Sequence, residues 1–270
     1  MLKQIIENKR KEVELAKKSM PLNTFKSKIQ KSTRNFKEAL SQNKLNLIAE
    51  FKRNSPSGNI NKKQFNMSAN RNAISEHAQK SPIFDIQNII KIYTQYADAV
   101  SVLTDKKFFS GSLEDMKDVS NLTHLPILRK DFIIDEYQIY GARLYGADAI
   151  LLIASVLSKG QIDDFIDIAK SMNVNCLVEV HTEDELNKVL DTKAEIIGVN
   201  NRNLDTLEID LNTTLRLADK IPSDKLIVSE SGIKDNDYVN KIKNKVNAIL
   251  VGSAFMNAAS IENEIVSILK

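Results

Sequence analysis

Residues 126–153 read PILRKDFIIDEYQIYGARLYGADAILLI, and this stretch contains the pattern that decides the fold. A short apolar run at 125–130 is followed by an amphipathic stretch and then by a second apolar run at 147–153. Both runs are hydrophobic at nearly every position, as expected for strands of a parallel sheet that is covered on both faces. The segment therefore predicts a strand, a helix and a second strand joined by short loops.

The same unit recurs along most of the chain. Eight short runs rich in Ile, Leu and Val begin near residues 45, 98, 125, 147, 175, 195, 225 and 247. Most of the spacings fit one strand, one helix and two loops, so the pattern predicts an α/β fold, the closed (β/α)₈ TIM barrel. The main alternative is an open doubly wound sheet, but its G-x-G-x-x-G nucleotide-binding turn does not follow the first run.

Length and patterning also predict the domain organisation. A chain of 270 residues fits one barrel, because such barrels commonly reach about 250 residues as a single unit. Before the first strand, Ile5, Ile6, Lys9, Val13 and Ala16 recur at steps of about three and four, which indicates a helix packed on the barrel. We therefore expect a single domain over 1–270, of which 1–44 is an N-terminal helical extension.

Composition and charge argue against several classes of protein. With one cysteine the chain cannot form an intrachain disulfide, and its first residues contain no apolar stretch long enough for a signal peptide or a spanning helix. Residues 1–63 hold 16 Lys and Arg against 5 Asp and Glu, whereas the rest holds 22 against 30. We interpret the basic segment as a solvated helix face, with a polyanion site as the alternative. We expect a cytoplasmic protein that binds neither nucleic acid nor membrane.

Charged side chains gather where the predicted strands end, which is where barrel enzymes place their catalytic groups. Glu50 and Lys52 are two residues apart and share a face of the first strand, and Lys130 ends the third strand. If both lysines enter the barrel mouth, Glu179 and Glu230 from later strands would compensate the cost of burying them. A structural ion pair or an exposed turn explains any one pair, but charged clusters at five strand ends favour acid and base chemistry.

Two glycine-containing motifs, SGI at 231–233 and VGSAF at 251–255, follow the seventh and eighth runs. Loops at these two positions of a barrel often present backbone N–H groups to a phosphate, and glycine permits a close approach. The two motifs together predict a phosphate site. The histidines match no metal-binding pattern and are expected to be structural or exposed, although the position of His181 after Glu179 leaves a minor site role open.

Seven strings, in chain order, closely resemble indole-3-glycerol phosphate synthase. They are IAEFKRNSPSG (48–58), SVLTDKKFFSGS (101–112), PILRKDFIIDEYQIYGARLYGADAILLI (126–153), LVEVHTEDEL (177–186), IIGVNNRNL (196–204), SESGI (229–233) and VGSAFM (251–256). The resemblance spans roughly residues 45–256. It implies an enzyme of tryptophan biosynthesis, a carboxy-lyase that converts 1-(o-carboxyphenylamino)-1-deoxyribulose 5-phosphate to indole-3-glycerol phosphate with loss of CO₂ and water, without a metal or an organic cofactor.

The resemblance also implies roles for individual residues. Lys130 looks like the general acid that protonates the substrate carbonyl, and Glu179 would stabilise or deprotonate the cationic intermediate. Lys52 would contact the substrate carboxylate and is a candidate second acid, and the order in which the two lysines act stays open. Glu50 and Asn200 would orient these groups. The positions that correspond to phosphate or substrate contacts, or that would line the pocket, are Ser55, Phe132, Arg202, Glu230, Ser231, Gly232, Gly252 and Ser253.

The chain departs from the family pattern in the loop after the first strand. Polar residues at 61–82 lengthen it, and Gly58 and Asn59 stand where many relatives have Lys-Gly. Because the sequence ends soon after the eighth unit, we expect a monofunctional enzyme, a monomer with a weak homodimer as the alternative. The rival hypotheses are another phosphate-binding barrel enzyme, such as a phosphoribosylanthranilate isomerase, and a non-catalytic phosphate-ligand-binding protein. The presence of both Lys130 and Lys52 disfavours the isomerase, and the presence of Lys130 and Glu179 disfavours the non-catalytic protein.

Overall fold

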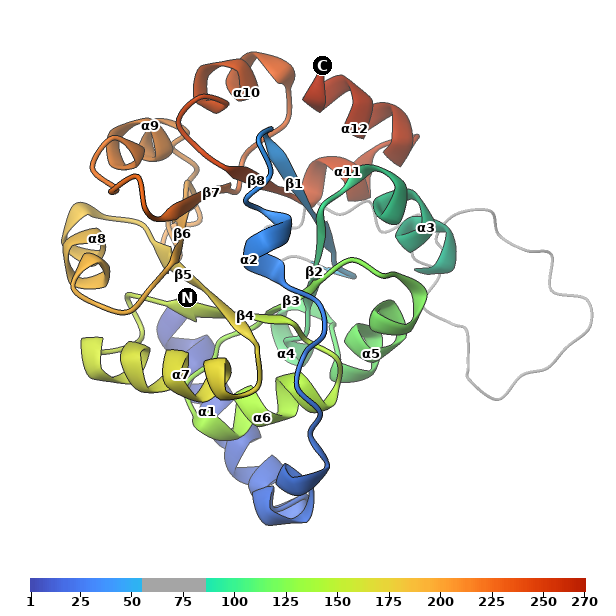
Figure 1. Cartoon of the computed structure of the whole chain (residues 1–270), viewed down its shortest axis with the longest axis vertical. Coiled ribbons are helices and arrows are strands. Elements are labelled where there is room, and N and C mark those ends of the chain that lie inside the picture. Colours follow the sequence, from blue (N-terminus) through green and yellow to red (C-terminus); the bar gives the residue numbers. More distant parts are fainter. Residues whose placement is uncertain (55–85) are drawn as a thin grey trace, which may run out of the picture.

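The computed structural model describes residues 1–54 and 86–270 and contains a closed barrel of eight parallel strands in sequence order (Figure 1). The strands are β1 (Asn46–Phe51), β2 (Ala99–Leu103), β3 (Ile127–Lys130), β4 (Ala149–Ile153), β5 (Asn175–Val180), β6 (Ile196–Asn200), β7 (Leu226–Glu230) and β8 (Ala248–Val251). Pairing of β8 with β1 closes the sheet. The predicted TIM barrel is confirmed, whereas the predicted insertion at 61–82 lies outside the described residues.

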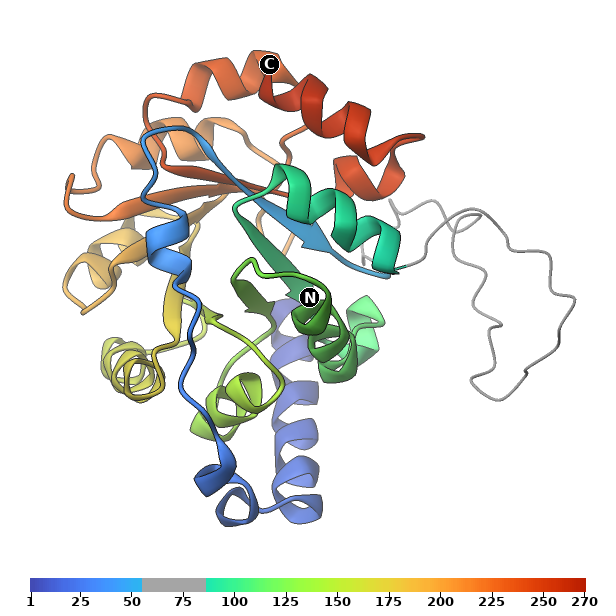
Figure 2. The same cartoon turned by 45° about the vertical axis from the view of Figure 1, so that its right-hand side comes forward.

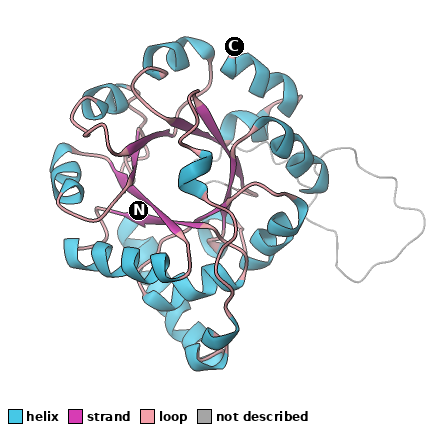
Figure 3. Ribbon diagram, in the orientation of Figure 1, coloured by secondary structure: helices cyan, strands magenta, loops and turns pink. Residues whose placement is uncertain are grey.

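Helices surround the strands as an outer ring, which Figure 3 shows in cyan around the magenta barrel. They are α3 (Ile86–Tyr96), α4 (Lys106–Phe109), α5 (Leu113–Leu122), α6 (Glu136–Leu144), α7 (Lys159–Ser171), α8 (Glu183–Leu190), α9 (Asn212–Ala218), α10 (Asn236–Ile242), α11 (Ser253–Asn257) and α12 (Ile261–Leu269). Several begin at an N-cap whose side chain accepts a backbone N–H; Ser158 of α7, for example, forms a full capping box with Gln161. Such caps determine where each loop at the mouth ends.

The core has two layers because strand side chains alternate between the barrel interior and the helices. In β1, Leu47 and Ala49 pack towards the helices, whereas Ile48 faces the small interior cluster. In β3, Leu128 likewise faces the interior. Side chains two residues apart on a strand share a face, so Glu50, two residues after Ile48, and Lys130, two residues after Leu128, also point into the barrel. Both lie at its carboxyl-terminal mouth.

The segment before β1 contains α1 (Leu2–Ser19), the short 3-10 helices η1 (Leu22–Thr24) and η2 (Lys26–Lys28), and α2 (Phe36–Ala39). In Figure 2, α1 extends away from the strands and the chain then returns to α2. Phe36 and Leu40 pack into the interior cluster and close the barrel end opposite the mouth. The predicted N-terminal helix is confirmed. None of the described helices is both long enough and apolar enough to span a bilayer.

A buried lysine fastens α1 to the barrel. Lys9 Nζ lies 2.8 Å from Asp105 Oδ2, 2.9 Å from Asp131 Oδ1 and 2.8 Å from Glu12 Oε2. Burial by itself lowers the pKa of the Lys9 ammonium, but the charges of Asp131 and Asp105 outweigh it and raise the pKa well above the ordinary value. Asp105 and Asp131 follow the ends of β2 and β3, so this helix packs directly against the loops of the mouth.

Candidate active site

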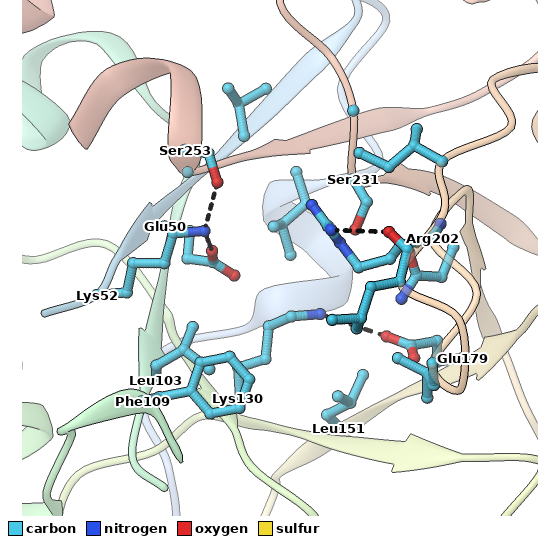
Figure 4. A pocket seen from close by; sticks show the side chains of 18 of the residues that line it. Glu50, Lys52, Leu103, Phe109, Lys130, Leu151, Glu179, Arg202, Ser231 and Ser253 are labelled. Carbon is cyan, nitrogen blue, oxygen red and sulfur yellow. Dashed lines mark hydrogen bonds and ion pairs between the residues drawn. The ribbon is translucent and has the colours of Figure 1, made fainter. Parts of the chain in front are cut away.

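The mouth of the barrel contains a cavity of about 170 Å³ that combines charged and apolar walls. Figure 4 shows Lys52 and Ser253 on one side of it and Arg202 and Glu179 on the other. The apolar wall comes from barrel strands, their loops and α1, and includes Met1, Leu2, Ile5, Leu103, Phe109, Phe132, Leu151, Ile153 and Leu204. A ligand with an apolar ring and anionic groups fits such a cavity.

Lys130 lies on the floor of the cavity between two carboxylates. Its Nζ is 2.6 Å from Glu230 Oε2 and 3.3 Å from Glu179 Oε2. Burial favours the neutral amine, yet the charges of Glu230 and Glu179 outweigh it and raise the pKa of Lys130 above the ordinary value. The side chain is therefore a protonated ammonium at neutral pH, ready to donate.

The three interior carboxylates outnumber the two lysines that contact them. Lys52 pairs with Glu50, so Lys130 is left with both Glu179 and Glu230. Burial, together with the neighbouring charge of Glu179, raises the pKa of Glu230 to about 7 despite the contact with Lys130. Its Oε1 is buried without a hydrogen-bond partner among the described residues. A carboxyl group that titrates near neutrality beside a lysine is typical of sites that transfer protons.

Two glycines make room for these carboxylates. A Cβ at Gly198, in the middle of β6, would lie 2.1 Å from Glu230 Oε1. A Cβ at Gly252, directly after β8, would lie 2.4 Å from Glu50 Oε1. No side chain can occupy either position without displacing the acidic group, so both glycines are required for the present arrangement.

Lys52 is held on the β1 and β8 side of the cavity. Its Nζ lies 2.9 Å from Glu50 Oε1 and donates a hydrogen bond to Ser253 Oγ at 2.8 Å. Glu50 and Lys52 share one face, as their spacing predicts, and that face is the barrel interior. The lysine is thus positioned beside the VGSAF motif.

The turn after β7 has a strained backbone. Ser231 has φ +66° and Gly232 has φ +81°, and the left-handed region is unusual for a serine. Asn201 holds the turn, because its Nδ2 donates to the backbone oxygens of Glu230 and Ser231 at 3.0 and 3.1 Å. The turn and Gly252–Ser253 both line the cavity, so the structure brings together the two motifs from which the phosphate site is predicted.

Asn200 and Arg202 extend the site from the end of β6. Asn200 Oδ1 accepts the backbone N–H of Arg202 at 2.9 Å, and the Asn200 side chain also hydrogen-bonds to Glu179. The Arg202 guanidinium donates to the Leu207 backbone oxygen at 3.1 Å, and burial lowers its pKa. The guanidinium is only partly hydrated, which strengthens its attraction for an anion in the cavity.

Glu179 has a second cationic neighbour that sequence reasoning left as a minor possibility. His181 Nε2 lies 3.2 Å from Glu179 Oε1, on the side away from Lys130. Burial raises the pKa of Glu179, but Lys130 and His181 outweigh it and the net pKa is below the ordinary range. The only sequence signal for this histidine is its spacing of two residues from Glu179.

The structure brings together nearly all of the predicted site residues. Glu50, Lys52, Lys130, Phe132, Glu179, Asn200, Arg202, Ser231, Gly232, Gly252 and Ser253 all line the cavity. Glu230 was expected to line the pocket but is fully buried beneath it, and it reaches the cavity only through Lys130. Ser55 lies outside the described residues. The contributions of Met1, Leu2 and Ile5 were not predicted, because the packing of α1 against the mouth has no local sequence signal.

Among residues 1–54 and 86–270, no three His, Cys, Asp or Glu side chains form a group that could hold a metal ion. The polar groups of the site are instead ammonium, guanidinium, carboxylate and hydroxyl groups from six strands and their loops. The arrangement can hold an anionic molecule, donate protons from two lysines and stabilise positive charge beside Glu179.

Comparison with known proteins gives the same picture along the whole chain. The family model described as indole-3-glycerol phosphate synthase matches residues 2–81 and 80–268. The indole-3-glycerol phosphate synthase of Alkaliphilus metalliredigens is 41% identical over 97% of this chain and 95% of its own length. The tryptophan biosynthesis protein TrpCF of Buchnera aphidicola from Schizaphis graminum is 42% identical over 100% of this chain, which spans only 55% of that relative.

Solved structures with similar folds are more distant in sequence. The 3-hexulose-6-phosphate synthase of Salmonella typhimurium superposes with a TM-score of 0.61 at 14% identity, covering 83% of this chain and 96% of that one. A chain of the tryptophan synthase complex of Pyrococcus furiosus gives a TM-score of 0.56 at 14% identity, with coverage of 83% and 97%. These two likenesses concern the fold alone.

Proposed function

The chain belongs to the indole-3-glycerol phosphate synthase family, and on that premise we propose that it is a carboxy-lyase of tryptophan biosynthesis. The proposed substrate is 1-(o-carboxyphenylamino)-1-deoxyribulose 5-phosphate, and the products are indole-3-glycerol phosphate, CO₂ and water. Because the chain spans only 55% of the length of the Buchnera TrpCF relative from Schizaphis graminum, the activity of the whole protein is part of this proposal.

One observation carries the proposal. The Lys130 ammonium, 2.6 Å and 3.3 Å from two carboxylates, lies on the floor of a cavity whose other walls are partly apolar. The apolar wall formed by Phe109 and Phe132 suits the carboxyphenyl ring. A proton donor beneath a cavity that accepts a ring is what a ring closure at a carbonyl carbon requires.

We assign the first proton to Lys130. As the ring carbon that bears the carboxylate bonds to the substrate carbonyl carbon, the carbonyl oxygen takes a proton from Nζ. The pair of electrons from the breaking carbon–carboxylate bond returns to the ring, and CO₂ leaves. Departure of CO₂ is favoured in a pocket with little water, where a charged carboxylate is poorly solvated.

Dehydration follows and needs a second proton donor and an anion. The new hydroxyl leaves as water after taking a proton, and we assign Lys52, next to Ser253, as the candidate donor. Glu179 stabilises the resulting cationic intermediate or takes the proton that restores the indole. Glu50 and Asn200 orient these groups, since each contacts one of the reacting side chains.

The phosphate of the substrate is assigned to the two turns at the ends of β7 and β8. Support comes from Ser231, Gly232, Gly252 and Ser253, which border one cavity with the proposed catalytic groups. Arg202 adds a partly dehydrated cation on the same side as Ser231 (Figure 4). We retain Ser55 in the proposal from the resemblance alone.

We further propose that residues 1–270 form one domain and that the protein acts as a monomer in the cytoplasm. Its proposed partner is a small phosphorylated metabolite. A biosynthetic family and a single, buried cysteine support a reducing compartment.

The test is to incubate the purified protein with the carboxyphenylamino-deoxyribulose phosphate and to follow indole fluorescence. We expect fluorescence to rise with enzyme concentration and to stop when the substrate is consumed. A protein that is folded by circular dichroism and yet produces no indole would overturn the proposal.

A further inference from the structure

The loop between β5 and α8 places an imidazole between two carboxylates. His181 Nε2 lies 3.2 Å from Glu179 Oε1, and His181 Nδ1 lies 3.1 Å from Glu185 Oε2. The same Glu185 oxygen accepts the backbone N–H of His181 at 2.7 Å. Only 11% of the His181 side chain is exposed, so the ring lies in a largely dry environment. Glu185 holds it through Nδ1, whereas Nε2 faces Glu179 at ion-pair distance and has no hydrogen-bond partner among the described residues.

The start of α8 builds this arrangement. Thr182 is the N-cap, and its side chain accepts the backbone N–H of Glu185 at 3.2 Å. In a capping box the acidic residue at this third position reaches back to the backbone N–H that precedes the helix. Here Glu185 reaches back one residue further, to His181, and so holds both its backbone and its ring. The residues that cap α8 therefore also hold the His181 ring in place.

The electrostatics of the ring follow from this geometry. Burial lowers the pKa of His181, but the contacts with Glu179 and Glu185 outweigh it and raise the pKa to about 10. The groups that face Glu179 from the other elements are Lys130 of β3, at 3.3 Å, and Asn200 of β6. The carboxylate thus has one cation on each side, with Lys130 at Oε2 and His181 at Oε1.

We propose that His181 is a positioning residue for Glu179, which keeps the carboxylate charged and aimed at the cavity through the reaction, and that Glu185 acts through it. The inference rests on the role of Glu179 in the proposed function. Once Lys130 has given its proton to the substrate, it no longer carries the charge that balances Glu179. The imidazolium then remains as the cation beside Glu179 when the cationic intermediate has to be stabilised.

The test compares two substitutions with two matched controls. His181→Asn removes the cation, and Glu185→Gln removes the outer carboxylate while leaving a residue that can still cap α8. Glu183→Gln is the control for Glu185, because Glu183 lies in the same helix turn and pairs with Lys220 at the surface. For the histidine, the control is replacement of the exposed His124 by Asn.

We expect His181→Asn to lower kcat about tenfold with KM changed less than about twofold, since the group acts on the intermediate more than on substrate binding. Loss of the imidazolium raises the pKa of Glu179, so kcat of His181→Asn should begin to fall at a higher pH than kcat of the wild type as the solution is acidified. Glu185→Gln changes both quantities in the same direction by less, and the two controls leave them unchanged. Wild-type kcat and an unmoved acidic limb in folded His181→Asn would overturn the inference.

A second measurement needs no turnover. Nitrogen-15 shifts of the His181 ring in the wild-type protein are expected to show both nitrogens protonated at about pH 8, and the ring pKa is expected to fall in Glu179→Gln and in Glu185→Gln. A ring that is neutral at that pH, or whose pKa is unchanged in both variants, contradicts the inference. The indole assay and the nitrogen-15 shifts separate the two proposals. A wild-type protein that makes no indole but shows these shifts disproves the proposed function, while the His181 ring is still shown to be a cation between Glu179 and Glu185.

Discussion

The two ends of the barrel both contain buried charged clusters, but the clusters differ in whether the hydrogen bonds of their carboxylates are satisfied. At the end opposite the mouth, Asp148 accepts from Arg34 Nε at 2.7 Å, Arg143 Nη1 at 2.8 Å, Ser32 Oγ at 2.6 Å and Ile127 N at 2.9 Å. At the mouth, Lys130 is shared by two carboxylates, and Glu230 Oε1 has no hydrogen-bond partner among the described residues.

The difference shows what each cluster does. A buried carboxylate with two guanidinium partners and a backbone donor has no capacity left for a ligand, so it stabilises the packing of the N-terminal extension against the barrel. The mouth cluster has a buried carboxylate oxygen without a hydrogen-bond partner among the described residues and borders a cavity, which is unfavourable for stability and useful for proton transfer. In a TIM barrel this division between a stability end and a chemical end is expected.

Removal of the central lysine should give the largest effect. We expect Lys130→Met to lower kcat by at least about 10² to 10⁴, since it removes the proposed acid. The fold should persist because Glu230, with a pKa of about 7, can take up a proton when its cationic partner is lost. Steady-state kinetics and thermal melting test this, with the exposed Lys193→Met as control. Turnover near the wild-type rate would contradict the assignment of Lys130.

At the opposite end, Asp148→Ala should damage stability and spare the chemistry. The substitution leaves Arg34 and Arg143 without their carboxylate, and loss of one partner from a buried ion cluster typically costs about 3–5 kcal/mol. Urea unfolding should show that loss, whereas kcat per folded molecule should stay within about twofold of the wild type. Stability within about 1 kcal/mol of the wild type would mean that this cluster does not anchor the extension.

Glu230→Gln should raise stability and lower activity, whereas Asp148→Ala should lower stability and leave activity unchanged. The pKa of Glu230 is raised from 4.5 to about 7 in the folded protein. The free energy of unfolding of the wild type therefore decreases as the pH rises through that window. Above about pH 7 we expect the Gln variant to be more stable than the wild type by about 1–3 kcal/mol, and below about pH 4.5 to be equal to it. Turnover should fall. Urea unfolding across the pH range tests this, and a stability difference that does not vary with pH would contradict it.

Removal of an exposed ion pair at the barrel end opposite the mouth should give the smallest effect. Lys37 Nζ lies 2.6 Å from Glu195 Oε1, and 36% and 59% of the two side chains are exposed. We expect Lys37→Ala to change the free energy of unfolding by less than about 0.5 kcal/mol and to leave turnover unchanged. If Lys37→Ala lowered the free energy of unfolding as much as Asp148→Ala does, the stabilisation by these ion pairs would depend on the distance between the charges and not on their burial.

Much of the site could be predicted because it depends on local spacing. Glu50 and Lys52 are two apart and both face the interior, and the SGI and VGSAF motifs follow their strands as expected. The exact partners could not be predicted in this way. Lys130 contacts Glu230 across 100 residues, and Lys52 contacts Ser253 across 201. These distances depend on how the barrel closes and on which rotamer each side chain adopts.

The sequence by itself determined the eight strand and helix units, the interior face of each strand and the chemical types of the residues at the mouth, because hydrophobic periodicity and turn residues act over short range. Only the tertiary structure decided that Glu230 lies beneath the cavity, that Lys9 is buried with three acidic residues and that His181 stands between two carboxylates. The physical reason is that burial and charge balance belong to the packed barrel, where groups distant in the chain share one desolvated space.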